Sequence, residues 1–278
     1  MPELPEVETI TRGLEKKIRG KIISDITLLD SVGNISKDLP KQKGFKIISL
    51  ARRGKYIIIN LSNNNSLIVH LRMSGQFLFD LEKSSPATRV IFKLNEGENS
   101  KNNGYEANVM YFNDFRKFGT IDIVETEKSN KFFEEKGLGP EPLTEHFTVN
   151  LFKSILGKKP KSRIKNMLLD QKVIAGLGNI YAQEACFLAG IVPERKVGTL
   201  NDKDLGKLYL AIREILTKAI EFNGTSFDTA YVTSEGEAGE FSQFLNVYHK
   251  NVCKVCNSKI TQIKMNSRGT YYCNVCQR

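Results

Sequence analysis

The chain begins Met-Pro-Glu, which places an imino acid next to a carboxylic acid. Removal of Met1 leaves Pro2 as a secondary amine, and an α-amino group has a pKa of about 8, against about 10.4 for lysine. More of this amine is unprotonated at neutral pH, so it can attack an electrophilic sugar carbon and form a cationic imine. Glu3 can give a proton to the same substrate. An ordinary helix start explains the same residues, since proline and acids favour a first turn.

Four of the five cysteines form two Cys-x2-Cys pairs near the end of the chain. This spacing is typical of a ribbon wrapped around one tetrahedral zinc ion, and disulfide bonds are the alternative. A site closed by four cysteines folds the chain and does not activate water. The predicted ligands of one structural zinc ion are Cys253, Cys256, Cys273 and Cys276. Cys186 lies in an apolar helical sequence and is predicted to be an inert core thiol.

The formal net charge of +10 indicates a polyanionic partner. Residues 241–278 contain no acid and six basic residues, and residues 153–165 form a second basic run. A lysine-rich composition spread over solvated surfaces is the alternative. Two acid-poor clusters favour a nucleic-acid surface.

A length of 278 residues suits two or three domains, and a 40% apolar content is ordinary for a globular protein. Within the sequence, no apolar run approaches the roughly 18 residues that span a bilayer. The acidic, proline-containing start does not resemble a secretory signal. We therefore expect a cytoplasmic protein without a membrane partner.

The first half of the sequence predicts a helix over 6–20 and then a series of short β-strands. They are rich in branched and aromatic residues and are separated by Gly, Asn and Ser, which is typical of an antiparallel sandwich or barrel. The polar stretch 95–104 is predicted to be a hairpin loop. The predicted strands are 21–29, 45–50, 56–61, 66–71, 76–81, 89–94, 108–112 and 120–125.

Beyond a Gly- and Pro-containing linker over 138–143 the pattern becomes helical, with apolar residues three and four apart. The glycines of Gly176-Leu-Gly178 let a backbone approach a phosphate, and Asn179 is expected to cap the next helix. We predict a multidomain α+β protein whose segments are a catalytic β-sandwich (1–130), a linker (131–147), a helical domain (148–240) and a zinc ribbon (241–278). The predicted helices are 150–156, 164–170, 179–189 and 202–222.

Five motifs, in this order, resemble the formamidopyrimidine-DNA glycosylase family over essentially the whole chain. They are PELPEVE, HLRMSG, NDFRKFG, GLGNIYA and the four-cysteine ribbon. The resemblance implies removal of 8-oxoguanine and formamidopyrimidines from duplex DNA, followed by cutting of the abasic strand. It also implies an N-terminal β-sandwich, a helix–two-turn–helix domain and a zinc ribbon, with DNA held between domains.

The resemblance implies a catalytic role for four residues. Pro2 attacks C1′ of the damaged nucleotide and Glu3 protonates the ring oxygen. The iminium then acidifies the neighbouring carbon, and β- and δ-eliminations release both phosphates. Lys55 is implied to contact a phosphate and donate a proton, and Arg268 to assist δ-elimination.

The resemblance further implies that a wedge of Met73, Arg116 and Phe118 fills the gap left by an extruded base. For Met73 alone a core position is the alternative, and for Arg116 a salt bridge with Asp114. The implied phosphate clamp is His70, Asn179 and Arg268, with weaker candidates at Lys159, Lys161, Lys165 and Tyr248. Residues 224–240 correspond to the family's lesion-capping loop.

One segment departs from the family pattern. Many members have Lys-His-x-His-Val entering a strand, where this chain has Pro86-Ala-Thr-Arg89-Val. A DNA contact from that histidine is therefore not expected, although Arg89 could serve instead.

Two other functions fit parts of the sequence. An endonuclease VIII-like glycosylase would share the fold but prefer oxidised pyrimidines, whereas Leu4, Val7 and Met73 favour the purine enzyme. A non-enzymatic zinc-ribbon protein that binds damaged DNA would form no covalent intermediate. Because one DNA duplex would occupy the cleft, a monomer is expected.

Overall fold

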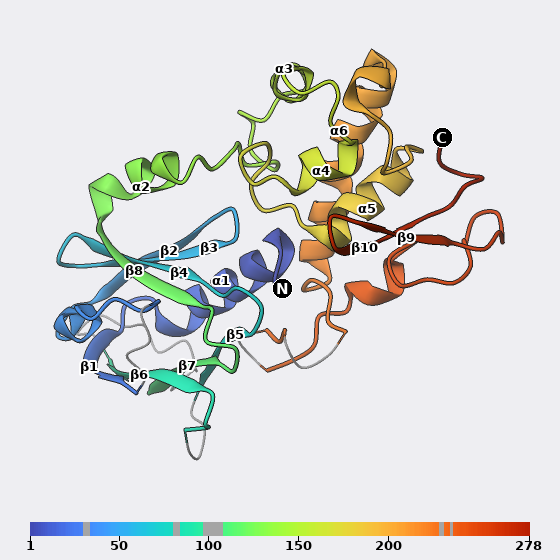
Figure 1. Cartoon of the computed structure of the whole chain (residues 1–278). Helices are drawn as coiled ribbons and strands as arrows, with labels where there is room; N and C mark the ends of the chain where they lie inside the picture. The colour runs from blue at the N-terminus through green and yellow to red at the C-terminus, as the bar shows by residue number, and fades with distance from the viewer. Residues whose placement is uncertain (30–33, 80–83, 97–107, 228–230, 234–235) are drawn as a thin grey trace. The chain divides into compact units, whose positions relative to one another are not determined.

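The computed structural model describes residues 1–278 except 30–33, 80–83, 97–107, 228–230 and 234–235 (Figure 1). The chain folds into two compact units, which are Met1–Lys136 with Phe222–Glu240, and Gly137–Glu221 with Phe241–Arg278. The predicted capping segment, 224–240, thus belongs to the same compact unit as the sandwich, whereas we predicted it as part of the helical domain, 148–240. The three predicted boundaries between the four segments stay a prediction.

The first unit begins with helix α1 (Leu4–Ile18), which starts two residues earlier than expected. The reason is a capping box, in which the backbone N–H of Glu3 donates to Glu6 Oε2 (2.7 Å) while the Glu3 side chain accepts from the Glu6 amide. Pro5 fits the first turn because its missing N–H is not needed there. The buried face repeats every three or four residues, with Val7, Ile10, Leu14 and Ile18.

Eight strands follow α1 and form two four-stranded antiparallel sheets, in the orders β1-β6-β7-β5 and β2-β3-β4-β8. This confirms the predicted sandwich. From residue 97 on, the predicted loop over 95–104 lies outside the described residues. The strands are β1 (Ile22–Leu28), β2 (Ile47–Arg53), β3 (Tyr56–Leu61), β4 (Asn65–His70), β5 (Gly75–Phe79), β6 (Thr88–Asn95), β7 (Val109–Asp114) and β8 (Thr120–Glu125).

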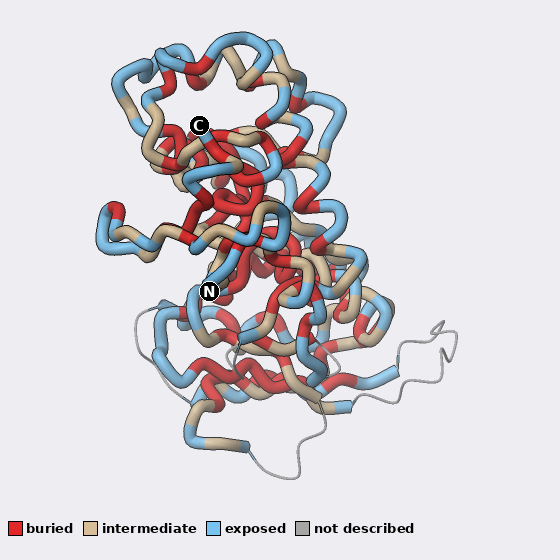
Figure 2. Tube along the Cα trace, turned by 90° about the vertical axis from the view of Figure 1, so that its right-hand side faces the viewer, coloured by how far each residue is buried: buried red, intermediate tan, exposed pale blue. Residues whose placement is uncertain are grey.

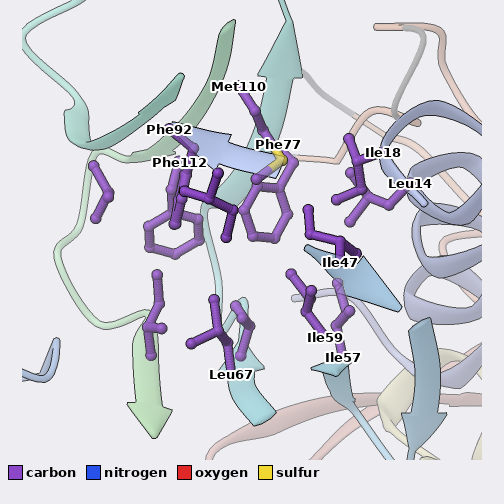
Figure 3. Packing of buried hydrophobic residues seen from close by; sticks show 14 of the residues in the cluster. Leu14, Ile18, Ile47, Ile57, Ile59, Leu67, Phe77, Phe92, Met110 and Phe112 are labelled. Carbon is purple, nitrogen blue, oxygen red and sulfur yellow. The ribbon is translucent and has the colours of Figure 1, made fainter. Parts of the chain in front are cut away.

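The two sheets and α1 share one apolar core, which Figure 3 shows from close by. Burial alternates residue by residue along β3, as expected for a strand with one face on a core. Figure 2 colours the described part of the chain by burial. Three further short elements of this unit were not predicted, which are η1 (Leu39–Gln42), η2 (Thr126–Lys128) and α2 (Ser129–Glu135). The core side chains labelled in Figure 3 are Leu14, Ile18, Ile47, Ile57, Ile59, Leu67, Phe77, Phe92, Met110 and Phe112.

The second unit combines helices with a two-stranded hairpin. Helix α5 is buried on almost all sides and packs against α6, α4 and β10. The hairpin turns at Asn266 and Ser267, both with positive φ. The elements are α3 (Val149–Gly157), α4 (Ile164–Leu169), α5 (Asn179–Leu188), η3 (Val197–Thr199), α6 (Asp202–Glu221), η4 (Phe241–Phe244), β9 (Thr261–Met265) and β10 (Arg268–Tyr272).

All four predicted helices of this unit are present within two residues of their expected ends. In the part of the chain that the structure describes, no helix is long and apolar enough to cross a membrane.

An ion pair ties α1 to the second sheet. Arg52 of β2 donates through Nε to Glu8 Oε2 (2.7 Å) and through Nη1 to the carbonyl of Gly54 (2.9 Å), while Arg12 Nε donates to Glu8 Oε1 (2.7 Å). Burial raises the pKa of Glu8, but the hydrogen bonds and charges of the two arginines outweigh it, so the pKa lies below 4.5. Glu8 therefore holds the turn between β2 and β3 against α1 as a carboxylate.

We expect Glu8→Gln to lower the free energy of unfolding by about 1 kcal/mol at neutral pH, because solvent screens a partly exposed pair. A carboxylate whose folded pKa is lowered stabilises the fold fully above its unfolded pKa, and loses this contribution as pH falls through the folded value. Urea unfolding at neutral pH and at about pH 3.5 measures the difference, which should shrink at the lower pH. Glu134→Gln, at an exposed acid of α2, is the control. A Glu8→Gln deficit that is equal at both pH values would contradict the assignment.

Candidate active site

The Pro2–Glu3 pair lies at the start of α1 and is fixed by one carboxylate. Glu6 Oε2 accepts from the Glu3 amide (2.7 Å) and Glu6 Oε1 accepts from the Thr225 amide (2.8 Å). Gly224, with φ +76°, completes this contact, because a Cβ there would lie 2.6 Å from Glu6 Oε1. The Glu6 carboxylate therefore fixes both the residue next to the candidate nucleophile and the first residues of the predicted capping segment.

The predicted capping segment is described in part, since 228–230 and 234–235 lie outside the described residues. Its described part is tied to the first unit by Tyr231, which is buried in the core and donates its hydroxyl to the Asn223 carbonyl (2.7 Å). Gly239 allows the two ends of the segment to meet, since a Cβ there would lie 2.5 Å from the Asn223 and Gly224 carbonyl oxygens.

Lys55 lies in the turn that Glu8 and Arg52 hold against α1. The turn needs a positive φ, which Gly54 supplies at +58°. Lys55 is buried, and Tyr56, the residue after it, pairs with His70 in the sheet. The structure thus brings the candidate lysine close in the fold to the first residue of the predicted phosphate clamp.

His70 is a neutral imidazole. Its Nδ1 accepts from the Arg72 amide (3.0 Å), which assigns the proton to Nε2. Burial, followed by the positive charges of Arg72 and Lys55, lowers the pKa of His70 from 6.5 to about 3. A neutral Nε2–H can donate a hydrogen bond to a phosphate oxygen.

The three predicted wedge residues lie on two turns. Met73 is in the β4–β5 turn and is 40% exposed, so it is not a core residue. Phe118 is in the β7–β8 turn and is 51% exposed, with the Arg116 guanidinium 5.3 Å from its ring centre. Phe115 of the same turn, which the sequence analysis did not select, is 82% exposed. Such exposed apolar side chains on turns are available to enter a base stack.

Arg89 does not replace the family's histidine as a DNA contact. It lies on β6 and is only 1% exposed. Its Nη1 donates to the Gly119 carbonyl (3.4 Å) and lies 3.9 Å from Asp114 Oδ2. Arg89, rather than Arg116, is therefore the arginine paired with Asp114. The sequence allowed a DNA contact for Arg89, because it does not show that this side chain is buried beside the Asp114 carboxylate.

In the second unit, the carbonyl of Gly269 organises the residues next to Arg268. It accepts from Asn179 Nδ2 (3.2 Å), Gln183 Nε2 (3.2 Å) and Lys165 Nζ (3.3 Å). Asn179 is thus brought next to the exposed Arg268. It does not cap α5, because Gly178 occupies the N-cap position.

Lys165 is a support and not a surface residue. It is 0% exposed, and its Nζ also donates to Thr270 Oγ1 (2.6 Å). The expected direct DNA contact therefore does not fit this lysine, which fixes the hairpin that carries Arg268. Lys159 and Lys161 are exposed, and Lys159 Nζ lies 3.4 Å from Asp170 Oδ2.

Tyr248 is held by Glu184, a residue that the sequence analysis missed. The buried Glu184 carboxylate accepts from the backbone amides of Asn246 (2.8 Å), Val247 (3.0 Å) and Tyr248 (2.9 Å). The neighbouring Gln183 accepts from the Tyr271 amide (2.6 Å). Two adjacent polar residues inside the apolar sequence of α5 were the available signal, since buried polar groups need partners.

The four predicted zinc ligands converge. Their sulfur atoms all lie within 4.8 Å of one another, with Cys253 and Cys276 3.8 Å apart and Cys256 and Cys273 3.4 Å apart. Zn–S bonds of about 2.3 Å give a tetrahedral edge of about 3.8 Å, whereas a disulfide bond is about 2.05 Å long. The donor set fits one structural zinc ion and not a pair of disulfides.

Three family models match the chain in order. They are the formamidopyrimidine-DNA glycosylase N-terminal domain over residues 1–121, the formamidopyrimidine-DNA glycosylase H2TH domain over 138–230, and the zinc finger found in FPG and IleRS over 250–278. The formamidopyrimidine-DNA glycosylase of Pelotomaculum thermopropionicum is 41% identical over 286 residues, which cover 100% of this chain and 99% of that protein. The chain belongs to the formamidopyrimidine-DNA glycosylase family.

Solved structures of the formamidopyrimidine-DNA glycosylase family have the same fold. A variant of the Lactococcus lactis enzyme in complex with DNA containing Fapy-dG matches with a TM-score of 0.90 and 35% identity over 100% of both chains. The Lactococcus lactis enzyme in complex with DNA containing an abasic site matches with a TM-score of 0.89 and 35% identity over 99% of both chains. The family assignment made from the sequence motifs is therefore confirmed, as is the four-cysteine zinc finger.

We expect removal of zinc to disorder the ribbon, because binding of a structural zinc ion supplies folding free energy. Cys256→Ser should lose most of the bound zinc and weaken DNA binding by more than about tenfold, as expected when several phosphate contacts are lost. Metal analysis and fluorescence anisotropy with a duplex measure the two effects. Cys186→Ala, which removes a buried thiol far along the sequence from the cluster, should keep one zinc ion per chain. Full zinc content in Cys256→Ser would contradict the ligand assignment.

We also expect His70 to stay neutral from about pH 8 to about pH 5, although a free histidine would protonate in this range. Nitrogen-15 NMR of the imidazole, assigned by comparison with His70→Gln, should show the Nε2–H tautomer throughout. Since the unfolded chain binds this proton at 6.5 and the folded chain only at about 3, stability falls as pH drops between these values. Titration of His70 near its ordinary value would contradict the assigned environment.

Proposed function

We propose that this chain excises oxidised purines, namely 8-oxoguanine and formamidopyrimidines, from duplex DNA and then cuts the abasic strand. The observation that carries the proposal is the anchoring of Pro2 and Glu3 by Glu6, which also binds the base of the segment 224–240. An amine nucleophile needs a defined position relative to the sugar, and a capping box at the helix start supplies it.

The reaction begins when the Pro2 nitrogen, freed by removal of Met1, donates its lone pair to C1′ of the extruded nucleotide. Glu3 protonates the ring oxygen, so the bond from C1′ to that oxygen breaks and the sugar opens. The bond from C1′ to the damaged base also breaks, and the departing base takes up the proton that the Pro2 nitrogen loses. The product is a cationic iminium between Pro2 and the sugar.

Strand cleavage follows from the iminium. Because it withdraws electrons, the neighbouring carbon loses a proton, and β-elimination expels the 3′-phosphate. A second elimination, δ, expels the 5′-phosphate. Lys55 and Arg268 neutralise the phosphates, and His70 and Asn179 position the backbone as neutral donors. Zinc supplies only the folding of the ribbon that carries Arg268.

Extrusion of the base costs a few kcal/mol of stacking and pairing. Met73 and Phe118 replace part of this stacking, and Arg116 can bond the orphaned partner base. Tyr248, Lys159 and Lys161 add phosphate contacts. We place this activity in the bacterial cytoplasm, on the DNA of the nucleoid, and expect a monomer to carry it out.

Borohydride trapping on a duplex with 8-oxoguanine opposite cytosine tests the proposal. The purified protein, with removal of Met1 verified by mass, should form a covalent adduct on the lesion strand. Pro2→Gly should form far less, because its primary amine lacks the fixed geometry of the proline ring. No adduct on this duplex or on an abasic duplex would sink the imine mechanism and favour the non-enzymatic binding protein. Trapping on thymine glycol in preference to 8-oxoguanine would favour the endonuclease VIII-like enzyme.

Glu3→Gln separates binding from chemistry. Its amide keeps the size of the side chain but cannot protonate the ring oxygen, so excision should fall by more than about 100-fold, the usual size of a general-acid contribution. DNA binding should survive within a few-fold. Retained excision would remove Glu3 from the acid role.

A further inference from the structure

The two turns that carry the candidate wedge connect paired strands, with Gly75 opposite Asp114 at the ends of β5 and β7, and the Ser74 hydroxyl adds a side-chain link between the turns. The Ser74 hydroxyl donates to Asp114 Oδ1 (2.5 Å) and accepts from the Arg116 backbone amide (3.1 Å). Ser74 directly follows Met73 in the β4–β5 turn, whereas Asp114 and Arg116 belong to the end of β7 and the turn after it. The two turns are therefore linked at the residues next to the side chains that would enter the DNA.

The carboxylate that receives this hydroxyl is buried and fully engaged. Asp114 Oδ2 accepts from the Gly119 amide (2.6 Å), so the same side chain also closes its own turn. Arg89 lies beside it, with Nη1 3.9 Å from Oδ2. A buried carboxylate with donors on both oxygens and a cation beside it has little freedom to move.

Each turn is also rigid in itself. In the first, the Gly75 amide donates to the Leu71 carbonyl (2.9 Å), and a Cβ on Gly75 would lie 2.5 Å from that oxygen. In the second, the Lys117 amide donates to the Asp114 carbonyl (3.2 Å), and a Cβ on Gly119 would lie 2.8 Å from Phe112 Cζ. The pairing of β4 with β8 and of β5 with β7 holds the strands that flank the two turns, and the Ser74 hydroxyl links the turns themselves, through Asp114 and the Arg116 amide.

We propose that Ser74 and Asp114, with Arg89 as their buried cation, are positioning residues that make the two turns enter the duplex as one body. This inference rests on the proposed function, since it assigns a role to the support of the wedge. Met73 and the Arg116–Phe118 pair act at the same extruded nucleotide. A fixed distance between their two turns avoids the entropic cost of ordering each turn separately upon binding.

The test compares Ser74→Ala with the wild type on two DNA substrates. On a duplex with 8-oxoguanine, which requires extrusion from the stack, excision should fall about tenfold, the effect of losing one hydrogen bond to a charged group. On a single-stranded abasic oligonucleotide, which requires no wedge, borohydride trapping should stay within about twofold, because Pro2 and Glu3 are untouched. A 2-aminopurine placed next to the lesion should show a matching loss of unstacking fluorescence in the duplex.

Two matched variants separate positioning from folding. Ser66→Ala, at the other end of β4, removes a buried hydroxyl that bonds Asn60 Oδ1 (2.7 Å) and Thr126 Oγ1 (2.9 Å), and should keep wild-type excision on both substrates. Ser74→Thr keeps the hydroxyl and should restore duplex excision.

Three results would overturn the inference. They are wild-type excision and fluorescence in Ser74→Ala, an equal loss on both substrates, and failure of Ser74→Thr to restore activity. If the wild type itself traps neither substrate, the proposed function fails instead, which is a separate and recognisable outcome.

Discussion

The buried carboxylate of Glu6 is the interaction on which the active end of this protein depends. Its two oxygens accept hydrogen bonds from two backbone amides that are far apart in the sequence, those of Glu3 and Thr225. Both amides lie where backbone donors would otherwise be unsatisfied, one at the first turn of a helix and the other at the entry to a loop. The contact explains why Gly224 must be glycine and why α1 begins at Leu4. The position of Pro2 is thus set by the hydrogen bond between the backbone amide of Glu3, the next residue, and the Glu6 carboxylate.

The same arrangement recurs beneath other functional side chains. Several residues that would touch DNA lie on segments held by a buried polar group. Glu184 lies under Tyr248, Lys165 beside the hairpin of Arg268, and Asp114 between the two wedge turns. Buried polar groups cost free energy unless they are bonded, so each of them accepts only one local geometry. The side chains that would contact DNA are therefore different from the buried side chains that hold their segments in position.

Most helices and strands and the zinc ligands could be predicted from the sequence, whereas the errors all concern polar contacts. Short runs of branched and aromatic residues between Gly, Asn and Ser located the eight strands, and the Cys-x2-Cys spacing located the zinc ligands, because both signals are local. The start of α1 was wrong because the capping box lies outside the apolar pattern. Lys165 and Arg89 were candidates for DNA contacts, but both are buried, and a linear sequence does not show which long cationic side chain lies against a carbonyl or carboxylate.

The segment Phe222–Glu240 belongs to the first unit, while the chain on both sides of it belongs to the second. The polypeptide therefore passes from one unit to the other three times, after Lys136, Glu221 and Glu240. Neither unit is a single continuous stretch of sequence. A fragment cut after Lys136 would keep Glu6 but lack Thr225, and the complementary fragment would carry Thr225 without its acceptor. Recombination at that boundary would separate the two halves of one anchor, so the two sequence segments of the first unit must be inherited together to keep it.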